Sequence, residues 1–187
     1  VENQLAKGNY NFTCLRAGII IGSGSASFEI IRDLVEKLPI MIAPKWLNTK
    51  TQPIGIRDVL QFLSQSLLND QTYNKSVDIG GPDVLSYKEM LLGYAKVRKL
   101  FRWIGIVPVM TPKLSSYWLY FITTTSFKLA SALVSSMKVE VICRNQELNE
   151  ILGIEPADYH TSLERTFSAI VDGHVISSWK DSMVSGV

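Results

Sequence analysis

The chain has 187 residues, of which 47% are hydrophobic and 19% charged, and its formal net charge is +2. This length and composition indicate one packed domain with at most a small appendage, and they exclude disordered and collagen-like chains. The nearly balanced charge gives no reason to expect nucleic acid as a partner. The two isolated cysteines, Cys14 and Cys143, favour buried apolar packing over a disulfide framework.

The first residue is Val1 rather than Met, and the opening residues lack the basic and apolar segments of a signal peptide. We therefore expect an internal piece of a longer protein, located in the cytoplasm.

The first part of the chain, up to Pro39, contains a strand signal followed by a helix signal. Residues 12–21 are β-branched and apolar, which predicts one buried parallel strand. A Gly-Ser break at residues 22–25 leads into a helix that ends before Pro39. Its apolar stripe comprises Phe28, Ile31, Leu34, Val35 and Leu38. The charged residues predicted to lie outside this stripe are Glu29, Arg32, Asp33 and Glu36.

The middle of the chain continues this alternation. Residues 40–43 and 52–56 predict short strands, separated by an exposed loop over residues 45–51. A leucine-rich helix follows, which Asp58 is placed to cap or to stabilise through the helix dipole. Residues 76–79 predict a further strand, ended by a Gly-Gly-Pro-Asp turn.

Ser86 and Glu89 form a capping-box pattern that opens a helix to about Arg98. Residues 103–109 predict a strand, and helix dominates from Thr111 to residue 137. Shorter helices are predicted over residues 146–152, ended by Gly153, and over residues 159–170. The sequence therefore predicts an α/β fold holding part of a parallel sheet, with an α-rich end.

The Gly22-Ser-Gly24-Ser-Ala-Ser27 turn nearly matches a dinucleotide-binding glycine pattern. Its third glycine position holds Ser27, and no acidic residue follows the next strand to hold a ribose. A tight strand-to-helix turn without an anion is the simpler interpretation.

Several polar residues have two interpretations. Arg16 interrupts an apolar strand, so it forms a structural ion pair or borders a ligand cleft. Arg57 and Asp58 are a cap with a surface ion pair, or a pair lining a cleft. His160 and His174 have no metal-ligand spacing with cysteines or acids, and we expect both to face solvent.

Residues 114–127 form an uncharged run of 14 residues between Lys113 and Lys128. A membrane-spanning helix needs about 17–25 apolar residues, and this run contains serines and threonines. A buried or amphipathic helix is predicted, with peripheral membrane contact as the alternative. The aromatic residues for such contact are Tyr117, Trp118, Tyr120 and Phe121.

The sequence holds no self-contained active site: it lacks a nucleophile elbow, a phosphate-binding Gly-Lys-Ser/Thr loop and a Tyr-x-x-x-Lys pair. Four stretches nevertheless resemble extended or atypical short-chain dehydrogenases/reductases, which include NAD-dependent epimerases/dehydratases and NmrA-like proteins. They are Val1-Glu2-x-x-Leu5, FTCLRAGIIIG at 12–22, QPIGIRDV at 52–59 and VDIGGP at 77–82. Their order and spacing resemble those of the C-terminal half of that family.

The resemblance implies a Rossmann-like α/β domain over residues 1–110 that is the C-terminal half of a larger one. Residues 111–170 would form a helical substrate region, and residues 171–187 the start of a further extension. The glycine-rich phosphate turn, the ribose contact and any Tyr-x-x-x-Lys would precede Val1.

NAD or NADP would then be bound mainly by residues outside this chain, with Ala17, Gly18, Ile19 and Ile20 beside the nicotinamide. Ser23, Tyr117, Trp118 and Tyr120 would contact a small-molecule substrate. No catalytic residue and no metal ligand is assigned.

The resemblance implies an NAD(P)-dependent oxidoreductase or a nucleoside-diphosphate-sugar epimerase-like protein. Gly22-Ser-Gly24 stands where the sugar-nucleotide enzymes usually carry an Asn-Pro or Tyr-Gly-Pro element, which favours an atypical member. The alternatives are a non-catalytic NmrA-like nucleotide sensor or scaffold, and a membrane-peripheral subunit.

Overall fold

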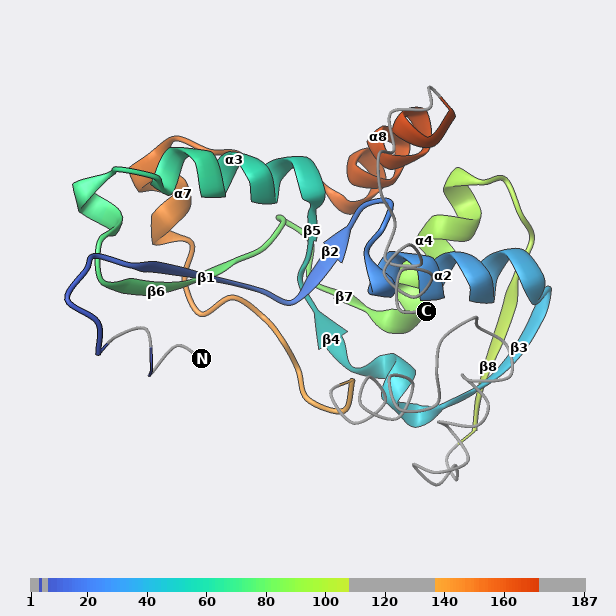
Figure 1. Ribbon diagram of the computed structural model, residues 1–187. Helices are drawn as coiled ribbons and strands as arrows, with labels where there is room; N and C mark the ends of the chain where they lie inside the picture. Colours follow the sequence, from blue (N-terminus) through green and yellow to red (C-terminus); the bar gives the residue numbers. More distant parts are fainter. Residues whose placement is uncertain (1–3, 5–6, 108–136, 172–187) are drawn as a thin grey trace, which may run out of the picture.

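A computed structural model of the chain describes residue 4, residues 7–107 and residues 137–171 (Figure 1). Parallel strand pairs and the helices that cover them form a mixed α/β fold, which confirms the predicted fold class. The helical region predicted between residues 111 and 137 lies almost entirely outside the described residues.

The strand predicted over residues 12–21 is two strands, β1 (Thr13–Ala17) and β2 (Ile19–Ile21). β1 pairs in parallel with β6 (Lys75–Ile79), whereas β2 pairs in parallel with β5 (Pro53–Gly55). The chain changes partner at Gly18, where a Cβ would lie only 2.9 Å from Val141 Cγ1. A continuous apolar pattern carries no information about such a change of partner.

Helix α2 (Ala26–Lys37) follows β2 and buries the predicted apolar stripe. The prediction that Glu29 and Asp33 lie outside the buried surface is wrong, because both are buried. Each has a cation one turn along the same helix: Glu29 pairs with Arg32, and Asp33 pairs with Lys37. These pairs compensate the burial of the two carboxylates.

The strands β3 (Ile40–Pro44) and β8 (Trp103–Val107) form a third parallel pair beside α2. Residues 45–51 are not the exposed loop that the sequence predicts. They form the 3₁₀ helix η1 (Lys45–Asn48), which buries Leu47, and the strand β4 (Lys50–Thr51). β4 pairs antiparallel with β7 (Leu85–Ser86).

Helix α3 (Ile56–Ser66) begins two residues before Asp58, so Asp58 does not cap this helix but lies in its first turn, where the alternative prediction of a favourable helix-dipole interaction holds. Asp58 is buried and accepts a hydrogen bond from the Ala157 N–H at 3.1 Å. Arg165 Nη1 lies 3.7 Å from its Oδ1, whereas the neighbouring Arg57 is exposed. Burial raises the pKa of the Asp58 carboxyl, against the opposing effects of Ala157 and Arg165.

One flank of α3 remains exposed. Phe62 and Val59 are buried beneath the helix. The exposed apolar residues beside them are Ile56, Leu60, Leu63, Leu67 and Leu68. The 3₁₀ helix η2 (Asp70–Thr72) then leads into β6.

The predicted capping box is confirmed at the start of α4 (Tyr87–Val97). Ser86 N donates to Glu89 Oε2 at 2.7 Å, and Glu89 N donates to Ser86 Oγ at 3.2 Å. The Ser86 N–H and the Ser86 hydroxyl, which also donates to Glu89 Oε2 at 2.7 Å, lower the pKa of Glu89 because they stabilise its ionised form.

The last two described helices also match the sequence prediction. α7 (Glu147–Leu152) ends at Gly153, which has the left-handed φ of 60° that glycine adopts without strain. Before α8 (Tyr159–Val171), the Asp158 carboxylate accepts from the Thr161 N–H at 2.7 Å. His160 is exposed as predicted, and His174 lies outside the described residues.

The buried side chains form two hydrophobic clusters. The larger one, here called the α2 cluster, joins α2, α4, α8, β2, β3 and β8 around Phe28 and Tyr94. The smaller one, the α3 cluster, joins α3, α7, β5 and β6 around Phe62. Figure 1 shows the β1–β6 pair and the β3–β8 pair at opposite ends of the molecule.

Candidate functional site

A cavity of about 280 Å³ lies where the parallel strands β1 and β6 end. Its walls are the carboxyl ends of the two strands, Gln52, and an extended segment over residues 140–144. The lining residues are Arg16, Ala17, Gly18, Gln52, Asp78, Ile79, Glu140, Val141, Ile142, Cys143 and Arg144. In open α/β sheets, ligands bind beyond the carboxyl ends of parallel strands, so this cavity is the candidate functional site.

An ion pair spans the two strands at the mouth of this cavity. Arg16 and Asp78 are opposite each other in the parallel register, and Arg16 Nε lies 2.8 Å from Asp78 Oδ1. The Arg144 N–H donates to the other carboxylate oxygen of Asp78 at 3.3 Å. The ion-pair interpretation of Arg16 is therefore confirmed, and Arg16 also lines the candidate site, whose role as a ligand cleft stays a prediction.

Gln52 holds the extended segment against the strands. Its buried side-chain amide donates to the Gly81 carbonyl at 2.6 Å, and its Oε1 accepts from the Cys143 N–H at 3.0 Å. The backbone adds to this attachment, because Gln52 N donates to the Val141 carbonyl at 3.0 Å. The buried Gln52 amide thus links the turn after β6 to the segment over residues 140–144. Both hydrogen bonds, of 2.6 and 3.0 Å, have ordinary lengths.

Cys143 is half-buried between Gly80 and Gln52. Burial, with a smaller effect from the Asp78 charge, raises the pKa of its thiol. A thiol kept protonated is a weak nucleophile, so no catalytic role is assigned to Cys143. Among the described residues, no group of three histidine, cysteine or acidic side chains is arranged to hold a metal ion.

The predicted site residues divide among different surroundings. Ala17 and Gly18 line the cavity at the strand ends. Ile19 instead lines a second, apolar cavity, and Ile20 packs against the α3 cluster. Ser23 is half-exposed in the turn after β2. Tyr117, Trp118 and Tyr120 lie outside the described residues.

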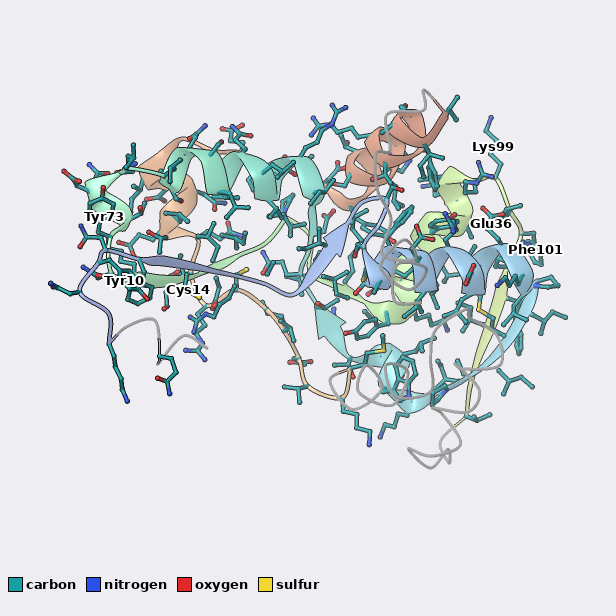
Figure 2. All side chains as sticks on the ribbon, viewed as in Figure 1. Tyr10, Cys14, Glu36, Tyr73, Lys99 and Phe101 are labelled. Atoms are coloured by element: carbon teal, nitrogen blue, oxygen red, sulfur yellow. The ribbon has the colours of Figure 1, made fainter. Side chains whose placement is uncertain are left out.

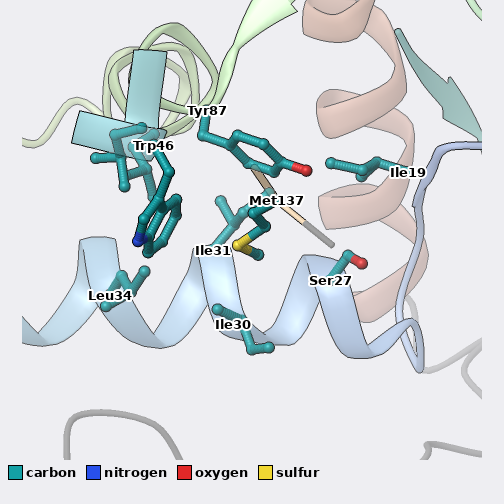
Figure 3. Close-up of a pocket in the computed structure, with 10 residues that line it drawn as sticks. Ile19, Ser27, Ile30, Ile31, Leu34, Trp46, Tyr87 and Met137 are labelled. Carbon is teal, nitrogen blue, oxygen red and sulfur yellow. The ribbon is translucent and has the colours of Figure 1, made fainter. Parts of the chain in front are cut away.

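The second cavity has a volume of about 30 Å³ and lies between α2, η1 and the start of α4 (Figure 3). Figure 3 shows Trp46 and Tyr87 beside Ile31 and Met137, and the two rings meet edge to face with centroids 6.1 Å apart. This space is comparable to one or two water molecules, so it is a packing gap and not a ligand site.

The Gly22–Ser27 turn has a steric reason for its glycines. A Cβ at Gly22 would lie 2.6 Å from Ile56 Cγ2, and Gly24 has a φ of 87°. Ser25 N donates to the Gly22 carbonyl at 3.1 Å and closes the turn. The close approach of Ile56 and the left-handed backbone are sufficient to require these glycines without a bound phosphate.

Sequence analysis missed Gln52 and the segment over residues 140–144. Gln52 stood at the start of a predicted strand, and its partner Cys143 is 91 residues further along the chain. No periodicity links such distant residues. Asp78 also stands in a short predicted strand, where an acidic residue needs a partner, but only the pairing of β1 with β6 identifies that partner as Arg16.

Comparison with solved structures identifies the fold. The chain aligns with an NADPH-dependent quinone oxidoreductase from Escherichia coli at a TM-score of 0.67 and 14% identity, covering 89% of this chain and 58% of that one. It aligns with a nucleoside-diphosphate-sugar epimerase from Staphylococcus aureus at a TM-score of 0.65 and 12% identity, covering 87% of this chain and 55% of that one. It aligns with the UDP-glucose 4-epimerase of Thermotoga maritima at a TM-score of 0.63 and 11% identity, covering 93% of this chain and 52% of that one.

The chain has the Rossmann-like fold of NAD(P)-dependent epimerases and reductases. It spans about half the length of the solved structures that it matches. No family model matches the sequence, and no curated protein matches it. In the described part of the chain, no helix has the length and apolar character needed to cross a membrane.

Proposed function

We propose that this chain is the C-terminal portion of an NAD(P)-dependent oxidoreductase or nucleoside-diphosphate-sugar epimerase-like protein. It supplies the nicotinamide-side wall and part of the substrate-side wall of the cleft. The cavity at the carboxyl ends of β1 and β6 carries this proposal, because Ala17 and Gly18 line it with almost no side chain. The methyl side chain of Ala17 lets a flat ring approach the strand, whereas the space beside Gly18 is filled by Val141.

The size of the cavity fits one end of a dinucleotide. Small-molecule sites usually enclose about 300–1,000 Å³, and this cavity of about 280 Å³ is just below that range. The Arg16–Asp78 pair would fix the mouth of the cleft, and Gln52 would hold the segment that closes it. The cofactor, when bound, would supply hydride chemistry.

Two further observations support a larger domain around this chain. Among the described residues, β1 has one strand neighbour, β6, so its other edge is open to another parallel strand. The exposed flank of α3, formed by Ile56, Leu60, Leu63, Leu67 and Leu68, offers apolar surface to a further layer. A preceding α/β half would cover both.

The test is a titration of the chain with nicotinamide mononucleotide, NADH and NADPH, followed by amide chemical shifts and calorimetry. We expect weak, millimolar binding, because most dinucleotide affinity comes from a pyrophosphate-binding turn that we assign to residues before Val1. The shifted amides should be those of residues 17–18, 78–79 and 141–144. Micromolar affinity with shifts confined to Gly22–Ser27 would overturn this assignment.

A protein extended upstream of Val1 through its natural reading frame gives the second half of the test. We expect micromolar binding of one nicotinamide cofactor, which Ala17→Phe weakens by filling the cavity. The matched control is Ala157→Phe, which adds the same bulk outside the cavity. Ala157 lies beside Asp58 and does not line this cavity. Cofactor binding without turnover of any carbonyl or sugar-nucleotide substrate would favour the non-catalytic NmrA-like alternative.

A further inference from the structure

The sheet formed by β3 and β8 has one buried side and one exposed apolar side. Met41 and Ile104 point inward and belong to the α2 cluster. The exposed side carries Ile40, Ile42 and Trp103, with exposed fractions of 65%, 58% and 55%. Phe101, two residues before β8, is 86% exposed. We call these four residues the outer β3–β8 face.

The parallel register makes the outer β3–β8 face continuous. Ile40 is opposite Trp103, and Ile42 is opposite Gly105. The Trp103 indole lies along its own strand over Gly105, since a Cβ at Gly105 would meet the indole Cη2 at 2.6 Å. The indole therefore fills the space beside Ile42. Figure 2 shows Phe101 projecting outward at the end of the molecule where β8 begins.

Nothing in the described fold uses this face. The same strands already fill the α2 cluster with their inward side chains. Two isoleucines, a tryptophan and a phenylalanine on one exposed surface exceed the scattered apolar residues that a folded surface normally shows. Such a surface indicates a partner.

Two exposed lysines flank the outer β3–β8 face. Lys45 follows β3 directly, and Lys99 precedes β8. In the described part of the chain, neither lysine forms an ion pair with a carboxylate. Arg102 turns to the inner side, where its Nε donates to the Val35 carbonyl of α2. The nearby Glu36 carboxylate is neutralised by Arg98, whose Nε lies 2.9 Å from its Oε1.

The sequence extends this positive character beyond the strand. Residues 90–139 contain no aspartate or glutamate. The cations in this stretch are Lys96, Arg98, Lys99, Arg102, Lys113, Lys128 and Lys138. The formal charge of the stretch is thus +7, against +2 for the whole chain.

We propose that the outer β3–β8 face docks on the surface of an anionic lipid bilayer. Tryptophan and phenylalanine favour the headgroup level of a membrane, where an apolar ring meets water. Each lysine or arginine near an anionic surface contributes about 1 kcal/mol, which corresponds to about fivefold in affinity. Protein interfaces are depleted in lysine, so a lysine-bearing rim favours lipid over a protein partner.

Figure 1 shows the β3–β8 pair at the end of the molecule away from the β1–β6 pair. The candidate cleft lies between the two pairs, since Glu140 lines both that cleft and the cavity beside Pro44 and Lys45 at the carboxyl end of β3. The proposed docking does not depend on cofactor binding.

Vesicle flotation of the purified chain tests the proposal. We expect it to float with vesicles of phosphatidylcholine containing phosphatidylserine and to remain in solution with phosphatidylcholine alone, with binding lost at high salt. Phe101→Ser and Trp103→Ser should each weaken binding about tenfold. Lys99→Glu should weaken it more than fivefold. Circular dichroism checks that each variant folds.

Matched variants keep the test specific. Leu60→Ser and Leu63→Ser remove exposed apolar side chains from α3, and Lys75→Glu reverses an exposed charge on β6. All three should bind vesicles like the unchanged chain. Failure to float with either vesicle, or equal losses in the control variants, would overturn the proposal. Self-association that Phe101→Ser abolishes, without vesicle binding, would assign the face to a second copy and also overturn it.

Discussion

The β1–β6 and β3–β8 pairs share one geometry and differ in chemistry. Each consists of two parallel strands of five residues in full register. The β1–β6 pair carries an arginine and an aspartate opposite each other near its carboxyl end, beside a partly polar cavity. The β3–β8 pair places isoleucines and a tryptophan on its outer side.

This difference in chemistry suits the two strand pairs to different kinds of ligand. A polar strand end with fixed ion pairs suits a small soluble ligand, because each charge is already oriented before the ligand arrives. An apolar strand face with cations at its edge suits an extended surface. The same backbone arrangement therefore borders a partly polar cavity in one pair and presents an exposed apolar face in the other.

The largest expected effect tests whether the two regions unfold together. Phe28 and Phe62 are fully buried at the centres of the α2 and α3 clusters. Replacing either by alanine should lower the free energy of unfolding by about 3–5 kcal/mol. Amide hydrogen exchange should rise over β3 and β8 in Phe28→Ala, and over β6 in Phe62→Ala. A uniform rise in both variants would show one cooperative unit.

The next effect concerns the contact between α3 and the segment that enters α8. Asp58→Ala should lower the free energy of unfolding by about 1–3 kcal/mol, because the Ala157 N–H loses its acceptor. Asp58→Asn keeps an acceptor oxygen and should cost less. Urea unfolding of the three proteins measures this difference. An asparagine variant as unstable as the alanine variant would show that the charge facing Arg165 dominates.

The same residue gives a pH dependence with a definite sign. The folded-state pKa of Asp58 is raised above its ordinary 3.8, so the folded state binds the proton more tightly than the unfolded state. Its contribution to stability is present below pH 3.8 and is lost as the pH rises through the folded-state pKa. In Asp58→Asn, the free energy of unfolding should not fall over this pH range, which urea unfolding at several pH values measures.

A smaller effect is expected at the capping box of α4. Ser86→Ala should lower the free energy of unfolding by about 1 kcal/mol. The pKa of Glu89 is lowered from 4.5, so its contribution is present above pH 4.5 and is lost as the pH falls through the folded-state pKa. This direction is opposite to that for Asp58. Glu89→Gln should abolish it, and an unchanged pH profile in that variant would contradict the assignment.

The smallest effect is expected for the ion pair between β1 and β6. The side chain of Arg16 is 41% exposed, so water screens its attraction to Asp78. A double-mutant cycle with Arg16→Met and Asp78→Asn should give a coupling of about 0.5 kcal/mol that decreases with salt. A coupling several times larger would mean that the pair stabilises the strands and does more than shape the cleft.

Local signals in the sequence located most elements. The Ser86–Glu89 capping box and the glycine at 153 set helix ends that the structure reproduces within about a residue. These features depend on neighbours in the chain, which a sequence displays directly. The predicted strand over residues 12–21 is divided at Gly18 for the opposite reason, since its two halves pair with different distant strands, β6 and β5.

The sequence by itself determined the α/β pattern, the capping box that opens α4 and the glycine that ends α7, because periodicity and capping are local. Only the tertiary structure decided that Asp58 holds Ala157, that Gln52 joins Gly81 to Cys143, and that the apolar strand residues of β3 and β8 divide between core and surface. Contacts between residues up to 99 positions apart require the packed chain, since buried polar groups take whichever partner the fold brings within hydrogen-bond distance.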